Sequence, residues 1–298
     1  MCGIVGLLLK NPALRPRLGE LMVPMMIGMT ERGPDSAGLA VFTEPVADPL
    51  HKLSLYAGSV AIDWDKFLQR LRASLAGDHA LKITANHAVL TTSAAPDVVE
   101  TWIDTHAPEL TVLCIGRAID LYKDIGAPAE VARRYEFAHL QGTHLVGHTR
   151  MATESAVTPA HAHPFTAGQD FCLVHNGSLS NPYMVRRKLE PLHIEFETDN
   201  DTEAACRYFE WRLREGDSLP AAVQRGFEEL DGFYTFLMGT DTELALVRDA
   251  FACKPAIVAE TDDYVAVASE FRSLAHLPRV HDAHLFEPKP QEVYSWRI

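Results

Sequence analysis

The stretch MCGIVG, residues 1–6, opens the chain and places a cysteine directly after the initiator methionine. A small residue in the second position usually allows the methionine to be removed. Cys2 would then carry a free α-amine beside its thiol, so that nucleophile and base share one residue. The apolar residues that follow, Ile4, Val5 and 7–9, also fit a buried strand, in which a free cysteine packs well. The stretch alone therefore leaves two interpretations open, an N-terminal nucleophile and a core residue.

The composition is that of an ordinary globular protein. The 298 residues are 47% hydrophobic, which is enough to bury one large core or two modest ones. The net charge is -13 and the isoelectric point is about 5.5, and no block of lysine or arginine interrupts the acidity. This charge argues against a surface for nucleic acid or for an anionic membrane, and we expect neither partner.

The cysteines are widely spaced and form no CxxC pair; they are Cys2, Cys114, Cys172, Cys206 and Cys253. This pattern fits neither a zinc site nor a disulfide framework, and it favours a reducing compartment. The first apolar run is too short for a signal peptide and lacks its basic flank, and no run approaches the length of a transmembrane helix. We therefore expect a cytoplasmic protein.

The spacing of the apolar residues predicts a mixture of helices and strands. Methionine and leucine recur at helical spacing over about 13–31, and a turn with glycine and proline then precedes the apolar strand 39–42. Residues from about 45 to 140 alternate strand, helix, strand, helix, which predicts an inserted subdomain. Short apolar strands that end in polar turns follow, with helices near 202–216 and 219–232 between them. This order indicates an α+β layered fold.

Three of the polar turns carry side chains of chemical interest. Arg150 ends one apolar strand, Asn176 and Gly177 end another, and Asp201 stands at the start of a helix. Each has an ordinary explanation on its own, as a surface charge, a strand-ending turn and a helix cap. Only their combination with Cys2 suggests a common site.

A series of short strings, taken together and in this order, resembles the class II glutamine amidotransferases, which are N-terminal-nucleophile hydrolases. The strings are MCGIVG, ERGPDSAG, GHTRMAT, AHAHPF, LVHNG, NDTE, LDGFYTF, RDAFACKP and ASE, and they run from residue 1 to residue 270. A series of this length argues against chance. The resemblance implies one amidotransferase domain over residues 1–298, with a four-layer αββα fold and an inserted α/β segment at about 45–140.

The resemblance also implies a role for each residue of the site. The Cys2 thiolate would attack the side-chain amide carbon of glutamine, giving a γ-glutamyl thioester and ammonia, while its freed α-amine moves the proton. The Asn176 side-chain amide and the Gly177 backbone N–H would form the oxyanion hole. Arg150 would bind the α-carboxylate of the substrate, and Asp201 would bind its α-ammonium group.

The two histidines of HAHPF, His161 and His163, would face one way on a strand. No carboxylate or cysteine joins them at ligand spacing, so we expect no metal, and we place His163 with the substrate-binding residues. No GxGxxG or GxxxxGKS/T string is present, and we expect no cofactor. His175 is expected to support the turn before Asn176, and Arg32 is expected to be structural.

Two departures from the family pattern narrow the choice of relative. Met151 stands where many members have tryptophan, and Ala252 stands where the RDxxGxxP pattern has glycine, which disfavours the sugar-phosphate enzymes. The strings GHTRMATES, LVHNGSLSN and RDAFACKPAIVAET are similar to the separate amidotransferase subunits of glutamate-synthase-like systems, including N-methylglutamate synthase. Because the chain ends soon after residue 277, we expect it to carry no synthase domain. The expected partners are L-glutamine and synthase subunits on separate chains, which would carry the flavin and iron–sulfur groups.

Two alternatives stay open at this stage. Cys2 could pass the γ-glutamyl group to an amine such as methylamine instead of to water. The chain could also be a silent subunit that keeps the fold to sense glutamine or to scaffold a partner. The intact set of Cys2, Arg150, Asn176, Gly177 and Asp201 argues against the silent subunit. The sequence leaves the ammonia acceptor and the oligomeric state open.

Overall fold

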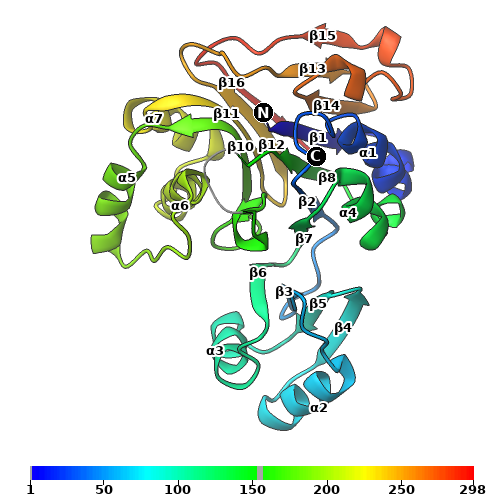
Figure 1. The fold of residues 1–298 in the computed structure, drawn as a ribbon, viewed down its shortest axis with the longest axis vertical. Helices are drawn as coiled ribbons and strands as arrows, with labels where there is room; N and C mark the ends of the chain where they lie inside the picture. The colour runs from blue at the N-terminus through cyan, green and yellow to red at the C-terminus, as the bar shows by residue number, and fades with distance from the viewer. Residues whose placement is uncertain (1, 153–156) are drawn as a thin grey trace.

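The computed structural model describes residues 2–152 and 157–298, and Figure 1 shows their arrangement. Met1, whose removal is expected, lies outside the described residues. The same holds for Thr153, the last residue of the string GHTRMAT. Within the described ranges, two antiparallel sheets form the centre of a larger body. One has seven strands in the order β15-β13-β14-β1-β8-β2-β7, and the other has five in the order β16-β12-β11-β10-β9.

The strands of these two sheets come from both halves of the chain. The first sheet contains β1 (Gly3–Leu9), β2 (Ser36–Phe42), β7 (Ile119–Ile125), β8 (His144–Arg150), β13 (Ile257–Glu260), β14 (Tyr264–Ala268) and β15 (His284–Phe286). The second contains β9 (Phe165–Thr166), β10 (Cys172–Leu179), β11 (Gly232–Gly239), β12 (Glu243–Arg248) and β16 (Val293–Arg297). Strand order therefore departs from chain order, and pairing is largely long-range.

β1 lies in the middle of the first sheet, between β14 and β8, and all seven of its residues are buried. Neighbouring side chains of a strand point to opposite faces. Ile4 and Leu8 therefore reach the space between the two sheets, while Val5 and Leu7 face the helices outside. A strand that is buried on both faces needs a continuous apolar run, and this is the run that follows Cys2 in the sequence.

Helices cover the outer face of each sheet and complete four layers (Figure 1). α1 (Leu18–Ile27) and α4 (Pro128–Arg134) pack on the first sheet. α5 (Pro182–Leu189), α6 (Asp201–Arg214) and α7 (Leu219–Glu229) pack on the second. A further apolar cluster, with side chains from β1, β2, β8, β10 and β12, fills the space between the sheets. The layers match the predicted αββα arrangement of an α+β fold.

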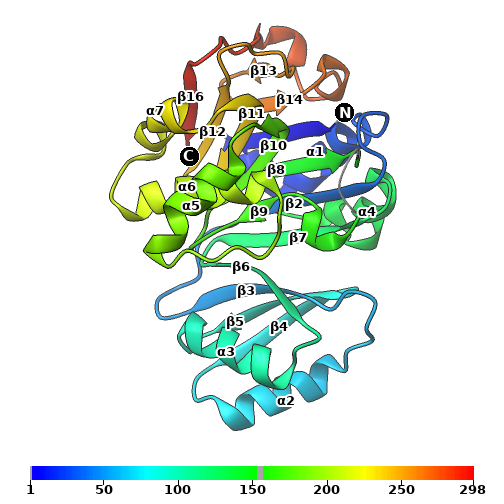
Figure 2. The ribbon, with the colours of Figure 1, turned by 60° about the vertical axis from the view of Figure 1, so that its left-hand side comes forward.

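A smaller body lies below this sandwich in Figure 2. It consists of β3 (His51–Tyr56), α2 (Trp64–Ser74), β4 (His79–Thr84), β5 (His87–Thr92), α3 (Pro96–His106) and β6 (Thr111–Gly116). Its antiparallel sheet has the order β4-β5-β3-β6, and it has its own apolar core around Phe67 and Trp102. Tyr56 ties this body to the larger one, because its hydroxyl donates to the Asp124 carboxylate over 2.9 Å.

The segment that forms the smaller body, residues 51–116, is shorter than the expected stretch of about 45–140. β7 returns to the seven-stranded sheet and pairs with β2 along its whole length. Tyr122 and Leu121 of β7 enter the two cores on opposite faces of that sheet, so the strand is suited to a layer between two apolar clusters. Whether the smaller body is an insertion relative to other family members stays a prediction.

The predicted helix over about 13–31 is divided in the structure. A 3-10 helix spans Pro12–Arg17 and α1 follows it, with Pro24 inside α1. The methionines Met22, Met25 and Met26 of α1 are buried in the core and act as packing residues. In the part of the chain that the structure describes, no helix is long and apolar enough to cross a membrane.

Candidate active site

One pocket of about 560 Å³ is lined by Cys2, Arg150, His163, Gly177 and Asp201, which are predicted site residues. Cys2 directly precedes β1, and Arg150 ends the neighbouring β8. The two strands pair antiparallel with Gly3 opposite Thr149, so Cys2 and Arg150 lie at the same end of the pair. Gly177 lies on β10 of the second sheet, and Asp201 is the first residue of α6. Two sheets and one helix therefore bring these residues together.

The backbone of Cys2 is held by two side chains. Arg32 donates from Nε to the Cys2 carbonyl oxygen over 3.0 Å, and Asn176, the remaining predicted residue, donates from Nδ2 to the same oxygen over 3.2 Å. Arg32 is in turn paired with Glu270 at 3.1 Å. The Cys2 Sγ lies 4.0 Å from the backbone oxygen of Met151. These contacts fix the Cys2 main chain at the pocket.

The start of β1 is also fastened to the residue that follows β14. Ile4 donates its N–H to Ser269 Oγ over 2.9 Å, and its carbonyl oxygen accepts the N–H of Ser269 at 3.0 Å. Ser269 and Glu270 belong to the string ASE, so one residue of this string holds β1 and the next holds Arg32. The string ASE therefore helps to position Cys2 indirectly, through β1 and through Arg32.

The end of β8 is braced by the loop that contains ERGPDSAG. Asp35 donates its N–H to the Arg150 carbonyl oxygen over 3.0 Å, and its carboxylate accepts the N–H of Ala152 at 2.8 Å. Gly33 packs so closely on Thr149 that a Cβ would collide with the backbone there. Arg150 itself is 5% exposed. The loop therefore needs its glycine in order to approach the strand that carries Arg150.

Gly177 has a backbone conformation that only glycine adopts easily. Its φ is +146°, and a Cβ would collide with the carbonyl oxygen of Phe233. Two residues further on, Leu179 donates its N–H to Asp201 Oδ2 over 2.8 Å. Residues two apart on a strand direct their N–H groups to the same side. The N–H of Gly177 therefore faces the edge of β10 on which Asp201 lies.

The carboxylate of Asp201 lies among hydrogen-bond donors. Its Oδ1 is 3.7 Å from His175 Nδ1, and its Oδ2 accepts the N–H of Leu179. Burial alone would raise the pKa of Asp201, but the neighbouring His175 and the hydrogen bond from the backbone N–H of Leu179 outweigh it, and the pKa falls below its usual range. Asp201 is therefore ionised at neutral pH and can accept hydrogen bonds from an ammonium group.

A cluster of three buried histidines, His148, His163 and His175, adjoins the pocket. The rings of His148 and His163 stack with their centres 4.1 Å apart. The Thr202 hydroxyl oxygen lies 2.9 Å from His163 Nε2 and 3.1 Å from His175 Nδ1. Burial lowers the pKa of His148 to about 3 and that of His163 well below its usual range, so both rings are neutral. His163 is thus a neutral wall residue of the pocket.

The two histidines of HAHPF have different partners. His161 Nε2 lies 2.9 Å from Asp199 Oδ1 and its Nδ1 lies 2.7 Å from the Thr158 hydroxyl, whereas His163 contacts Thr202. Over residues 2–152 and 157–298, no group of three or more His, Cys, Asp or Glu side chains is arranged to hold a metal ion.

The lining of the pocket also includes residues that were not singled out in the sequence, among them Thr202, Phe233 and Lys254. Phe233 and Lys254 stand inside the strings LDGFYTF and RDAFACKP, but nothing in their spacing distinguishes them from their neighbours. The turn before Lys254 is closed by Asp249, whose carboxylate accepts the N–H of Phe251 at 2.7 Å. The hydroxyl of Thr202 contacts His163 and His175, which are far from it in the sequence. Only the structure shows these contacts.

Comparison with known proteins gives the same family over the whole chain. Residues 148–276 match the family described as a glutamine amidotransferase domain. The chain is 43% identical over 297 residues to the glutamine amidotransferase-like protein GlxB of Rhizobium meliloti, which covers 99% of this chain and 98% of that protein. It is 31% identical over 305 residues to a putative glutamine amidotransferase of Methanothermobacter thermautotrophicus, which covers 99% of this chain and 100% of that protein.

A solved structure shares the fold. Glutamine phosphoribosylpyrophosphate amidotransferase from B. subtilis, complexed with ADP and GMP, matches with a TM-score of 0.60 and 18% identity over 99% of this chain and 49% of that chain. This chain therefore spans about half the length of that protein, and the likeness concerns the fold alone. It confirms the predicted four-layer architecture. The chain belongs to the class II glutamine amidotransferases, the glutamine-hydrolysing enzymes with the N-terminal-nucleophile fold.

Proposed function

We propose that Cys2 hydrolyses the side-chain amide of L-glutamine and that the ammonia passes to a synthase partner on a separate chain. The observation that carries the first part is the convergence of Cys2, Arg150, Gly177 and Asp201 on one pocket, with Asn176 bonded to the Cys2 carbonyl oxygen. Membership of the amidotransferase family supports the same reaction class.

The first chemical step forms a thioester. Once Met1 has been removed, the α-amine of Cys2 accepts the thiol proton, Sγ bonds to the side-chain amide carbon of glutamine, and an oxyanion develops on the former carbonyl oxygen. An α-amine of ordinary basicity can accept and return a proton near neutral pH. It returns the proton to the leaving nitrogen, the carbon–nitrogen bond breaks, and ammonia departs.

The second step hydrolyses the thioester. The α-amine takes a proton from water, the hydroxide bonds to the thioester carbon, and collapse of the second oxyanion releases glutamate and the Cys2 thiolate, which regains the proton. Asn176 and Gly177 stabilise both oxyanions. The amide nitrogen of Asn176 has two N–H groups, so one can hold the Cys2 carbonyl oxygen while the other faces the oxyanion.

Arg150 and Asp201 hold the amino-acid end of glutamine in this proposal. The planar guanidinium of Arg150 suits the α-carboxylate, because two parallel N–H groups can meet its two oxygens. The ionised carboxylate of Asp201 accepts hydrogen bonds from the α-ammonium group. His163 closes the wall of the pocket beside the substrate. Fixing glutamine at this end leaves its side-chain amide at Cys2.

The partner is proposed to be a synthase of glutamate-synthase-like type. Release of ammonia into solvent would consume glutamine without a product that uses the nitrogen. A synthase partner that receives the ammonia would incorporate this nitrogen. The type of partner rests on the resemblance of GHTRMATES, LVHNGSLSN and RDAFACKPAIVAET to the separate amidotransferase subunits of such systems. The two long relatives, which this chain covers almost end to end, are themselves named only as amidotransferases.

A pair of cysteine variants tests the chemistry. Cys2→Ala should abolish glutamine hydrolysis, and Cys253→Ala, which changes an exposed free cysteine, should retain it. Mass spectrometry of the purified chain should show that Met1 is absent, since a retained methionine turns the catalytic amine into an amide. Hydrolysis of glutamine at the normal rate by Cys2→Ala would contradict the proposed mechanism.

A second experiment tests the fate of the products. Glutamine hydrolysis should rise when the chain is assayed with co-purified glutamate-synthase-like subunits, and less free ammonia should escape. Equal and high activity with and without those subunits would indicate an independent glutaminase. Product analysis in the presence of methylamine separates hydrolysis from γ-glutamyl transfer, because transfer would yield γ-glutamylmethylamide in place of glutamate.

A further inference from the structure

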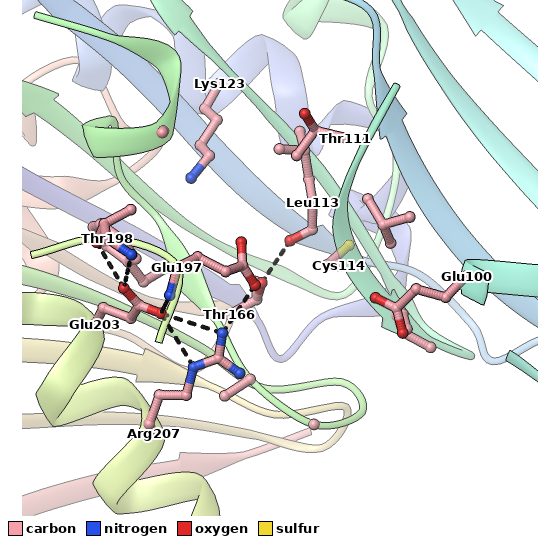
Figure 3. Close-up of a pocket in the computed structure, with 16 residues that line it drawn as sticks. Glu100, Thr111, Leu113, Cys114, Lys123, Thr166, Glu197, Thr198, Glu203 and Arg207 are labelled. Atoms are coloured by element: carbon pink, nitrogen blue, oxygen red, sulfur yellow. Dashed lines mark hydrogen bonds and ion pairs between the residues drawn. The ribbon is translucent and has the colours of Figure 1, made fainter. Parts of the chain in front are cut away.

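A second pocket, of about 400 Å³, lies where the smaller body meets the larger one (Figure 3). Its walls come from α3 and β6 on one side and from β7, β9 and α6 on the other. This volume falls within the range of small-molecule sites. It shares a wall with the glutamine pocket, because Thr202 lines that pocket while the adjacent Glu203 lines this one. The amidotransferase chemistry makes no use of this second pocket.

Lys123 supplies a buried positive charge to the second pocket. Its side chain is 6% exposed, and its Nζ points into the pocket in Figure 3. The Nζ donates to the carbonyl oxygens of Ala162 at 3.0 Å and Pro164 at 3.4 Å, and it lies 4.9 Å from the ring centre of Phe165. These partners carry no negative charge, and an ammonium group has a third N–H to donate. Burial lowers the pKa of Lys123 to about 8, so the group is still mostly charged at neutral pH.

Glu100 and Glu197 supply negative charge to the same pocket. Glu100 comes from α3 of the smaller body, and Figure 3 shows it on the side opposite Lys123. Glu197 pairs through Oε1 with Arg207 at 2.9 Å. Burial, followed by the negative charges of Asp104 and Glu197, raises the pKa of Glu100. An ammonium group placed between the two glutamates would relieve their repulsion.

Glu203, the third carboxylate of the pocket, has its acceptors occupied. It is 2% exposed and accepts the backbone N–H groups of Glu197 at 2.8 Å and Thr198 at 2.7 Å. It also accepts the Thr198 hydroxyl at 2.6 Å and pairs with Arg207 at 3.2 Å. Glu203 therefore fixes the wall that presents Glu197. Arg207 is shared between these two carboxylates, whereas Lys123 and Glu100 stand outside this ion-pair network.

We propose that this second pocket binds a small α-amino acid as its zwitterion, with the carboxylate on Lys123 and the ammonium group between Glu100 and Glu197. A simple anion would bring its charge close to two glutamates, and a simple cation would bring its charge close to the buried lysine. A zwitterion compensates both charges at once. The site is separate from the glutamine pocket and does not depend on the chemistry of Cys2.

Calorimetric titration of the full chain in its Cys2→Ala form tests the proposal, because this variant leaves glutamine intact. The probes are the individual L-amino acids, with glutarate as a dianion without an ammonium group and methylamine as a cation without a carboxylate. At least one amino acid should bind, and its affinity should survive a further Asp201→Asn change in the glutamine pocket. Lys123→Met and Glu197→Gln should each weaken that binding at least tenfold, whereas Lys66→Met, at an exposed lysine of α2, should leave it unchanged.

The variants are chosen so that the proposal can fail. Circular dichroism checks that Lys123→Met folds. If it does not fold, Glu197→Gln still tests the proposal, because this change keeps the size of a largely exposed side chain. Three results would overturn the proposal. They are no binding by any amino acid, binding that Asp201→Asn abolishes while Lys123→Met and Glu197→Gln leave it intact, and binding of glutarate or methylamine as tight as that of the amino acid.

Discussion

Arg32 donates from Nε to the backbone carbonyl oxygen of Cys2 over 3.0 Å, from the loop that follows α1. Its guanidinium also pairs with Glu270 at 3.1 Å, and its side chain is 9% exposed. A charged group this deeply buried is normally held by an opposite charge, and here that charge comes from the string ASE. Arg32 therefore connects two of the sequence strings to the position of Cys2.

Arg32→Gln should lower kcat for glutamine hydrolysis by roughly 10- to 100-fold, since a small misplacement of a reacting group has an effect of this order. The KM should change little, because Arg32 contacts Cys2 and not the pocket residues proposed to bind glutamine. Steady-state kinetics measures both. Arg17→Gln, at a half-exposed arginine paired with Glu20, is the matched control and should behave like the unmodified chain. A raised KM with normal kcat would contradict the positioning role.

Asn176→Ala and Asp201→Asn should separate chemistry from binding. Loss of an oxyanion donor at Asn176 should lower kcat by roughly 10²- to 10³-fold, about 3 kcal/mol of barrier. Asp201→Asn removes the charge proposed to meet the α-ammonium group, so it should mainly raise the KM, and Arg150→Lys should do the same at the carboxylate. Asn11→Ala, at an asparagine bonded to Asp263, is the control for the amide deletion. The reverse pattern in the two variants would show that the roles are wrongly assigned.

Stability should fall when the pH is lowered from about 6.5 towards 5. Burial lowers the pKa of His87 and His148 to about 3 and that of His144 to about 4, whereas an unfolded histidine titrates near 6.5. Between these pKa values the unfolded chain binds more protons than the folded chain. The contribution of these histidines to the free energy of unfolding is therefore complete above about pH 6.5 and is lost as the pH falls. Each histidine contributes a slope of up to about 1.4 kcal/mol per pH unit.

Urea unfolding at several pH values between 7.5 and 5 measures this slope. His144→Gln should reduce the slope by about one buried histidine's share, up to about 1.4 kcal/mol per pH unit, whatever it does to stability at pH 7.5. His139→Gln is the control, because the side chain of His139 is 82% exposed, and it should leave the slope unchanged. Identical slopes in the two variants would remove the histidine explanation.

Ala252→Gly should stabilise the fold. Ala252 has a φ of +48°, and the left-handed conformation costs an L residue about 1–2 kcal/mol, while added chain freedom in the unfolded state offsets about 0.5–1 kcal/mol of the gain. The expected net increase in the free energy of unfolding is therefore about 0.5–1 kcal/mol. Ala283→Gly, at a φ of -71°, should lower it by a similar amount. Destabilisation by both changes would show that φ does not decide the effect.

The sequence by itself determined the family, the layered fold and the six candidate residues. The apolar run after Cys2 could predict a central strand because a strand buried on both faces needs apolar side chains at successive positions. The methionines of α1 could be placed in the core by their helical spacing. The strings around Arg150, Asn176 and Asp201 could be recognised as a series, since each combines a strand or helix end with a polar side chain.

Only the tertiary structure decided which distant groups support the site. The sequence does not show that Arg32 reaches the Cys2 carbonyl oxygen, or that a Cβ at position 177 would collide with Phe233. The sequence also does not show that β7, which lies within the expected stretch of about 45–140, pairs with β2 of the seven-stranded sheet. Spacing along the chain determines which face of an element is apolar. Contacts between residues far apart in the chain are determined by the packing of the layers, which local patterns do not contain.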